Sequence, residues 1–175
     1  MVDIVIALVL LCFGSLGFWD GLVKKSFAIA ALLIAIVAAT KFMNPLGEFL
    51  ITVSALPGDV VLTVAFALIF VGIMVLGRVI YGFREEKSGV FLISDKVAAI
   101  WLGFLEGAAV VSLVLVLLGI FEIPSAETQQ RSFFYKRLVV FAPWIYDNIV
   151  GVLPQSNEFY EELGKNFEKF RVVAP

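Results

Sequence analysis

The chain contains no histidine among its 175 residues, and Cys12 is its single cysteine. Without an imidazole group, the chain lacks a histidine base, a histidine metal ligand and a serine–histidine–aspartate triad. One cysteine likewise excludes an internal disulfide bond and a cysteine-based metal cluster. We therefore predict a protein that is not an enzyme, with no catalytic residues and no cofactor or metal site.

Charged residues are also scarce, at 16% of the chain, and the formal net charge is −2. Acidic and basic side chains are mixed over the polar connections, and the sequence has no basic tract of the kind that binds nucleic acid. We therefore expect no nucleic-acid partner.

Apolar residues are what the sequence has in abundance. They make up 61% of the chain, and the mean hydropathy is +1.02, which is more apolar surface than a soluble domain of this length can bury. They also form runs of roughly 20 residues, the length at which a helix crosses a hydrocarbon core. The sequence therefore predicts an integral membrane protein of the all-α class, surrounded by the lipid bilayer.

Four apolar runs predict four transmembrane helices, at about residues 3–19, 27–43, 60–80 and 97–121. Only Lys24, Lys25 and Ser26 separate the first two runs, so these helices are expected to form a tight antiparallel hairpin. A second hairpin joins the third and fourth helices. Residues 1–123 are thus predicted to be a four-helix transmembrane domain.

Helix-breaking and capping residues mark the expected ends of the middle helices. Asn44 and Pro45 are expected to end the second helix, and Asp59 is expected to cap the third. Between them, the apolar stretch 49–56 is too short to cross lipid and is expected at the membrane interface.

The pattern changes beyond the fourth run, where charged and aromatic residues alternate. Residues 124–175 are too polar to cross lipid and are predicted to form amphipathic helices on the membrane surface, with an interruption at Pro143. The last helix, at about residues 157–170, places Glu161 and Lys165 as an i,i+4 pair.

Basic and aromatic residues indicate how the chain is oriented. The middle connection carries only Lys41, whereas the first and third carry Lys24, Lys25, Arg78, Arg84, Lys87 and Lys96. By the positive-inside rule the first and third connections face the cytoplasm, so both termini are expected to be extracytoplasmic. The side chains expected to anchor the protein at headgroup level are Trp19, Trp101, Trp144 and Tyr146.

Two short segments of similar sequence occur in the first and fourth predicted helices. Gly17-Phe18-Trp19-Asp20-Gly21 is echoed by Gly103-Phe104-Leu105-Glu106-Gly107, and each places two glycines four residues apart. This spacing lets helix backbones approach closely in lipid, and Gly14 extends the smooth face of the first helix. Packing within the chain and binding of another membrane protein or a second copy are both open for these glycines.

The chain resembles the colicin V production proteins, small multi-pass proteins of the bacterial inner membrane. The shared features, over roughly residues 1–144, are Asp3, Gly17 to Lys25, Asp95 with Lys96, Gly103 to Gly107, and Ser132 to Pro143. The resemblance implies a role in production or export of a peptide toxin or in envelope homeostasis, and no enzymatic reaction. Members of the family often carry arginine where this chain has Asp20 and Glu106, so a role of those arginines does not transfer here.

Of the charged residues in or beside the predicted spans, Glu106, Asp20 and Arg78 are the candidates for an intramembrane role, since an unpaired charge there costs about 2.5 to 3.5 kcal/mol. Glu106 lies inside the fourth span, Asp20 ends the first, and Arg78, near the end of the third, is the expected partner of both carboxylates. Glu106 has two interpretations: a paired or neutral carboxyl that fixes helix register, or a proton or ion relay.

Three functions are compatible with these features. The first is a non-enzymatic inner-membrane protein that supports toxin production, toxin export or envelope homeostasis through other membrane components. The second is a small oligomeric transporter or channel that uses Glu106. The third is a membrane subunit of an enzyme complex whose chemistry lies on a partner.

Overall fold

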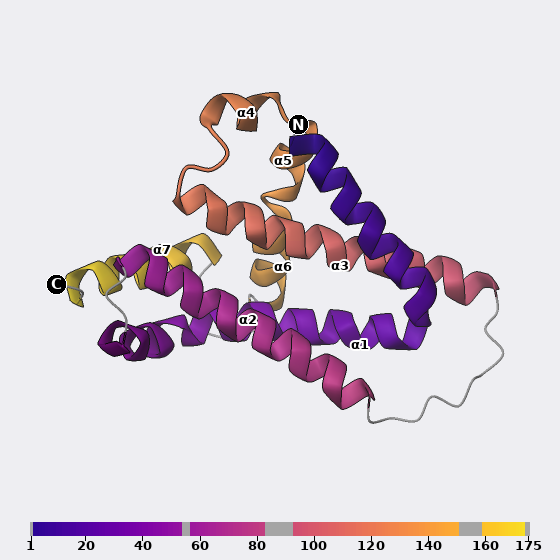
Figure 1. Ribbon diagram of the computed structural model, residues 1–175, viewed down its shortest axis with the longest axis horizontal. Coiled ribbons are helices and arrows are strands. Elements are labelled where there is room, and N and C mark those ends of the chain that lie inside the picture. Colours follow the sequence, from indigo (N-terminus) through magenta and orange to yellow (C-terminus); the bar gives the residue numbers. More distant parts are fainter. Residues whose placement is uncertain (1, 54–56, 83–92, 151–158, 174–175) are drawn as a thin grey trace. The chain divides into compact units, whose positions relative to one another are not determined.

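The structure is a computed structural model that describes residues 2–53, 57–82, 93–150 and 159–173 (Figure 1). Apart from short turns, these residues are helical, and no strand occurs among them, as the predicted all-α class requires. The helices are α1 (Val2–Val53), α2 (Gly58–Gly82), α3 (Ile93–Ile120), α4 (Ala126–Arg131), α5 (Phe133–Leu138), α6 (Phe141–Val150) and α7 (Phe159–Val173).

Three of the described helices, α1, α2 and α3, are long and apolar enough to cross a membrane. The spans predicted at residues 60–80 and 97–121 fall on α2 and α3, although α3 already ends at Ile120. The other two predicted spans both fall within α1, which is 52 residues long. The structure thus has three spanning-length helices where the sequence predicts four.

A single residue, Gly21, interrupts α1. Its backbone has φ 77° and ψ 168°, a conformation essentially restricted to glycine, and the chain changes direction there (Figure 1). The break was expected at Lys24, Lys25 and Ser26, but these residues continue the helix, and the Ser26 hydroxyl donates to the Leu22 carbonyl at 3.0 Å. The turn lies at Gly21 because the bend needs a backbone without a Cβ.

The second segment of α1 does not end where the sequence predicted. It runs through Asn44 and Pro45 to Val53, so part of the stretch 49–56 continues the helix, while residues 54–56 lie outside the described residues. Proline within a membrane helix is tolerated where neighbouring groups satisfy the freed backbone. Pro45 leaves the Lys41 carbonyl without its usual helical donor, and one residue earlier the side-chain amide of Asn166 donates to the Thr40 carbonyl at 3.0 Å.

Two further helix boundaries differ from the predictions. α2 already begins at Gly58, so Asp59 lies inside its first turn instead of capping it. Pro143 does not interrupt a helix; it is the third residue of α6, where its missing N–H is not needed. The predicted pair between Glu161 and Lys165 is confirmed, with an N–O distance of 3.4 Å.

The chain forms two compact units, each assembled from segments distant in sequence. The first unit comprises Met1–Ala30 and Val79–Ala142, and the second comprises Ala31–Arg78 and Pro143–Pro175. The predicted division at residue 123 into a transmembrane domain and an interfacial region stays a prediction.

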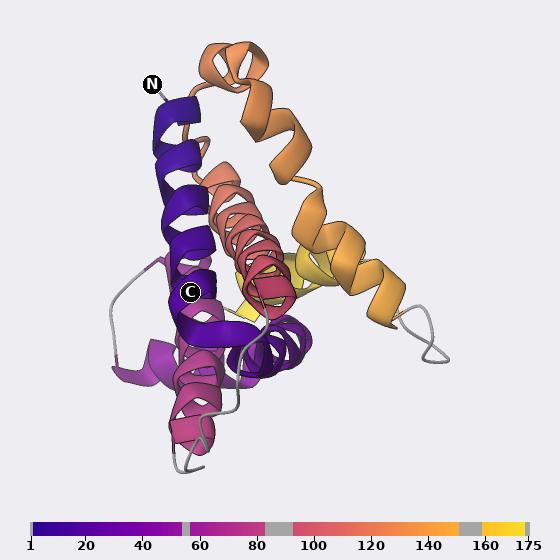
Figure 2. The same ribbon diagram turned by 90° about the vertical axis from the view of Figure 1, so that its right-hand side faces the viewer.

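In the first unit, the segment of α1 before Gly21 runs beside α3 (Figure 2). Ile6 of this segment packs with Val111 and Leu115 of α3 and with Tyr135 of α5 in a buried apolar cluster. Because Ile6 meets the end of α3 and Gly17 meets its beginning at Ala99, the two helices are antiparallel.

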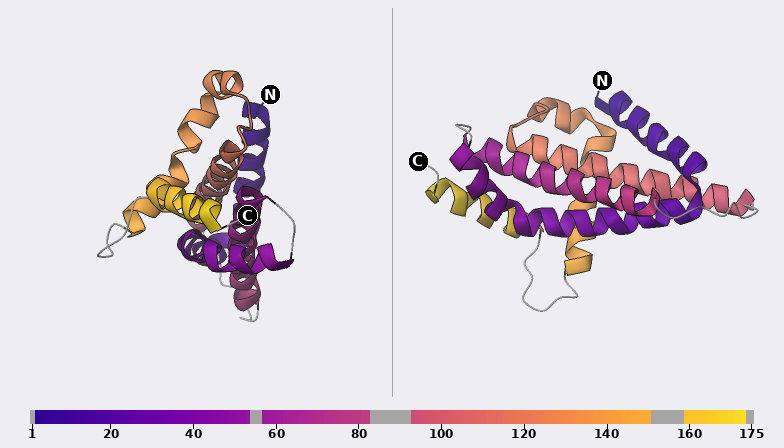
Figure 3. Two further views of the ribbon diagram at one scale, coloured as in Figure 1. Left: turned by 90° about the vertical axis from the view of Figure 1, so that its left-hand side faces the viewer. Right: turned by 60° about the horizontal axis from the view of Figure 1, so that its bottom comes forward.

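In the second unit, the rest of α1 packs against α2, and α7 lies beside the later part of α1 (Figure 3). Gly77 of α2 lies so close to Ala31 of α1 that an added Cβ would be 2.7 Å from the Ala31 Cβ. Buried residues recur at helical spacing on both helices, at Leu32, Ala35, Ile36, Ala39 and Met43 and at Val61, Leu62, Ala65 and Phe66. Close contacts at glycines thus join the first predicted span to the fourth and the second predicted span to the third. The predicted arrangement of the four spans as two hairpins is not confirmed.

Candidate functional site

Four charged side chains meet in the first unit, and we call them the charged cluster. Lys25 Nζ donates to Glu106 Oε2 at 2.6 Å, and the two side chains are only 1% and 0% exposed. The same ammonium lies 3.5 Å from Asp20 Oδ2, and the other oxygen of Asp20 accepts from Lys24. Two cations and two anions therefore alternate from the half-exposed Lys24 to the buried Glu106.

The bend at Gly21 brings Lys25 into this position. After the bend, Lys25 lies back at the level of Phe13, and its ammonium is 6.0 Å from the centre of the Phe13 ring. At this distance the ring face adds a weak attraction for the cation. A polar residue just beyond a turn is thereby placed against α3, which carries Glu106.

Glycines hold α1 and α3 at the distance that the ion pair requires. A Cβ at Gly17 would overlap the carbonyl oxygen of Ala99, and a Cβ at Gly103 would overlap the carbonyl oxygen of Phe13. Both neighbours are backbone atoms, which cannot rotate away. The two helices therefore touch through their main chains, the kind of contact that stabilises helix pairs in lipid.

Two more of the predicted glycines belong to this contact. A Cβ at Gly14 would lie 2.7 Å from the Phe104 ring, and one at Gly107 would lie 2.7 Å from the Phe13 Cβ. We call Gly14, Gly17, Gly103 and Gly107 the glycine seam. Gly21 serves the bend instead. These four glycines therefore lie in the contact between α1 and α3, as the interpretation of packing within the chain expects, and binding of a partner through them stays a prediction.

The arrangement is chemically suited to fix helix register. An ion pair removed from water is stabilising only when its geometry is good, but losing one partner leaves a costly isolated charge. One acceptor is left over: Glu106 Oε1 is buried and has no hydrogen-bond partner among the described residues.

The prediction that Arg78 pairs with the carboxylates of Asp20 and Glu106 was wrong. Arg78 is exposed and takes part in none of the ion pairs among the described residues, whereas Lys25 pairs with Glu106. The sequence reading missed Lys25 because it was assigned to a solvated turn. The signal that could have identified Lys25 is Gly21, four residues before it, because a glycine next to Asp20 near the end of an apolar run is compatible with a bend.

A second polar contact ties the start of α1 to the start of α5. The Ser132 hydroxyl donates to Asp3 Oδ1 at 2.6 Å, and the backbone N–H of Phe134 donates to the same oxygen at 3.0 Å. The N–H of Phe133 donates to Oδ2 at 3.3 Å. Asp3 therefore caps α5 in trans, where a carboxylate is favoured by the helix dipole.

The aromatic residues expected at headgroup level fall into two groups. Trp19, Trp101 and Trp144 are 83%, 67% and 60% exposed, as an anchoring side chain must be. Tyr146 is buried, with its ring 5.2 Å from that of Phe159 between centroids, and this position does not fit the predicted anchoring role. Tyr146 instead joins α6 to α7 within the second unit.

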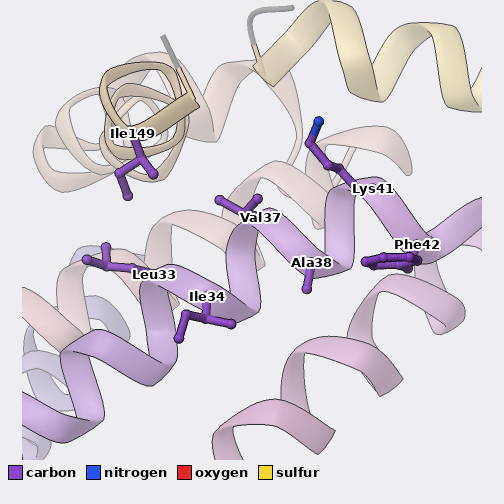
Figure 4. A pocket seen from close by; sticks show the side chains of 7 residues that line it. All are labelled: Leu33, Ile34, Val37, Ala38, Lys41, Phe42 and Ile149. Atoms are coloured by element: carbon purple, nitrogen blue, oxygen red, sulfur yellow. The ribbon is translucent and has the colours of Figure 1, made fainter. Parts of the chain in front are cut away.

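An apolar groove lies in the second unit between α1 and α6 (Figure 4). Its volume is about 390 Å³, and it is lined by Leu33, Ile34, Val37, Ala38, Lys41, Phe42 and Ile149. Leu33, Val37 and Lys41 follow one another at four-residue spacing on the side of α1 that faces Ile149 (Figure 4). No group of three or more acidic or cysteine side chains that could hold a metal occurs among the residues described.

The family model described as Colicin V production protein matches residues 2–143 of the chain. The match includes the whole of α1, α2 and α3, and with them the charged cluster and the glycine seam. No curated protein and no solved structure matches.

Proposed function

This chain belongs to the colicin V production protein family, and from this premise we propose that it is a four-span protein of the bacterial inner membrane that supports toxin production, toxin export or envelope homeostasis. We propose further that it catalyses no reaction and acts by holding other membrane components. The observation that carries this proposal is a contrast: the charged cluster and the glycine seam are formed within the chain, whereas an apolar face of α2 is exposed.

The bond between Asp3 and Ser132 supports four spans. It holds the start of α1 and the residues after α3 on one side of the membrane. Since the first segment of α1 and α3 are antiparallel, Gly21 and Ile93 lie together on the other side. The chain between them must then cross an even number of times, and segment 22–53 of α1 and α2 provide two crossings.

The same geometry supports extracytoplasmic termini. Trp19 and Trp101, at the end of one span and the start of another, are both exposed and belong to the same interface. Lys24 lies on this side as well, which makes it the cytoplasmic side by the positive-inside rule. Arg84 and Lys87, which also entered the prediction, lie outside the described residues.

The open face of α2 is the surface that we assign to other membrane proteins or to a second copy. Leu68, Val71 and Val75 are 52%, 55% and 53% exposed along one side of α2. Gly72 lies among them, and an added Cβ there would meet no atom within 4 Å. A small residue on an apolar face lets a second helix approach closely in lipid.

Complementation of a deletion strain tests the proposal. Cells that lack the protein and secrete a peptide toxin receive the wild type, Gly72→Trp or the control Val114→Trp, which adds the same bulk to an exposed position of α3. We expect Gly72→Trp to insert normally but to lose toxin secretion and detergent resistance, while Val114→Trp retains both. Full complementation by Gly72→Trp would reject the α2 surface, and a deletion strain without either defect would reject the function.

A transporter or channel is the second candidate, favoured by the buried Glu106 Oε1, which has no hydrogen-bond partner among the described residues. Glu106→Gln keeps the shape of the side chain and removes the carboxyl group. If this variant assembles normally but fails to complement the deletion strain, the relay is supported. Full complementation by Glu106→Gln would exclude it.

A further inference from the structure

The groove between α1 and α6 is apolar along most of its length and charged at one end. Leu33 and Val37 line it at one end, Ile149 covers it from α6, and Lys41 stands at the other end (Figure 4). Leu33 and Lys41 are eight residues apart, which corresponds to about 12 Å along a helix. The groove is therefore an elongated apolar track that ends at a cation.

The polar end of this track lies at the level where the chain becomes polar. Asn44 Nδ2 donates to Asn166 Oδ1 at 2.6 Å, and Asn166 reaches the Thr40 carbonyl. These bonds bring α7, which is too polar to cross lipid, to the α1 residues on both sides of Lys41. Lys41 therefore belongs to the headgroup level, and Leu33 to the hydrocarbon.

Lys41 is also an uncompensated charge. It is exposed, and it takes part in none of the ion pairs among the described residues, in contrast to Lys25 and Lys165. A lone ammonium at the headgroup level attracts anionic groups, and its flexible stem lies along the apolar surface. The occupant that matches an apolar track with a cation at its outer end has an apolar chain and an anionic head.

We propose that this groove binds one anionic phospholipid, with its phosphate at the Lys41 ammonium and an acyl chain along Leu33, Val37 and Ile149. The site goes beyond the proposed function, and its volume of about 390 Å³ is sufficient for part of one acyl chain. A partner helix does not fit the observations as well, because it would not neutralise Lys41 unless it carried an anionic residue at that level.

Native mass spectrometry of the full chain in detergent tests the site, with phosphatidylglycerol as the probe and phosphatidylcholine of equal chain length for comparison. We expect the wild type to retain one phosphatidylglycerol about five-fold more tightly than phosphatidylcholine, since one basic residue near anionic lipid contributes about 1 kcal/mol. Lys41→Gln is expected to lose this preference.

The matched control is Lys136→Gln, which removes an equally exposed lysine from α5. It is expected to retain the wild-type preference. If the two variants show the same preference between the two lipids, or if the wild type does not distinguish the lipids, the proposal is wrong.

A second pair of variants tests the apolar part of the site. Val37→Trp fills the groove and is expected to weaken the binding of both lipids. Val114→Trp, at an exposed position of α3, is expected to leave the binding of both lipids unchanged. Unchanged lipid binding by a folded Val37→Trp protein would overturn the groove as the site.

Discussion

The two units of this protein solve the same problem, helix association in lipid, by different means. In the first unit, α1 and α3 touch through the backbones of the glycine seam, and the contact encloses an ion pair. In the second, α1 and α2 pack mainly through medium-sized apolar side chains, and one amide bridge reaches α7. Lipid gives little hydrophobic force between helices, so close approach and buried polar pairs carry more of the association in the first unit.

The ion pair offers the strongest test of this contrast. Lys25→Met leaves the Glu106 carboxylate without its cation, and we expect the free energy of unfolding to fall by about 3 to 5 kcal/mol. The double variant Lys25→Met/Glu106→Met is expected to recover most of this loss, because no isolated charge is left. Unfolding in mixed micelles of dodecylmaltoside and sodium dodecyl sulfate measures the free energy of unfolding of the single and the double variant.

Lys165→Met is the control, since it breaks the exposed pair with Glu161 and is expected to cost only about 0.3 to 0.5 kcal/mol. Equal losses for Lys25→Met and Lys165→Met would contradict a buried and isolated pair in the first unit.

The glycine seam gives the next largest expected effect. Gly103→Leu forces a side chain into the Phe13 carbonyl and is expected to destabilise the first unit by about 1 to 3 kcal/mol or more. Gly72→Leu, on the open face of α2, is expected to leave stability nearly unchanged. The same unfolding assay compares them, and comparable losses for the two variants would show that α1 and α3 do not meet through their backbones.

The amide bridge of the second unit is expected to matter less. Asn166→Ala removes its hydrogen bonds to Asn44 and to the Thr40 carbonyl, at an expected cost of about 1 kcal/mol. Asn148→Ala is the control, because the Asn148 amide is exposed and bonds only within its own helix. A loss for Asn166→Ala as large as that for Lys25→Met would remove the distinction between the units.

The smallest effect is confined to alkaline solution. Burial, followed by the nearby Glu162 and Asp147 carboxylates, raises the pKa of Tyr146 to about 12. The unfolded chain releases this proton near pH 10, so the contribution of Tyr146 is complete below that pH and is lost as the pH rises toward 12. Tyr146→Phe is expected to weaken this alkaline loss of stability, as measured by the same unfolding assay at rising pH. A pH dependence of stability that Tyr146→Phe leaves unchanged would contradict the burial of the Tyr146 phenol.

Local sequence was sufficient for the all-α class and for the presence of long apolar helices. Apolar runs of about 20 residues indicate helices that cross lipid, and glycines four residues apart lie on one helix face whatever the fold. The position of Glu106 within the membrane stays a prediction, because it depends on the depth of the residue in lipid. These features need no knowledge of which helices are neighbours.

The partner of Glu106 was not predictable in the same way. Lys25 reaches Glu106 only because the chain turns at Gly21 and because α3, far along the sequence, packs beside the first segment of α1. The trans cap of α5 by Asp3 has the same origin, since it joins residues 129 positions apart. Pro45 lies inside α1, although proline locally disfavours the interior of a helix.

The bend at Gly21 sets a strict spacing between two elements of the first unit. Only three residues separate it from Lys25, and each residue added to that interval would swing the lysine by about 100° around its helix. A one-residue insertion or deletion there would turn the ammonium away from α3 toward lipid, even though every side chain were kept. The tolerance of this protein to length changes is therefore expected to be least in the interval that looks, from composition alone, like an ordinary polar linker.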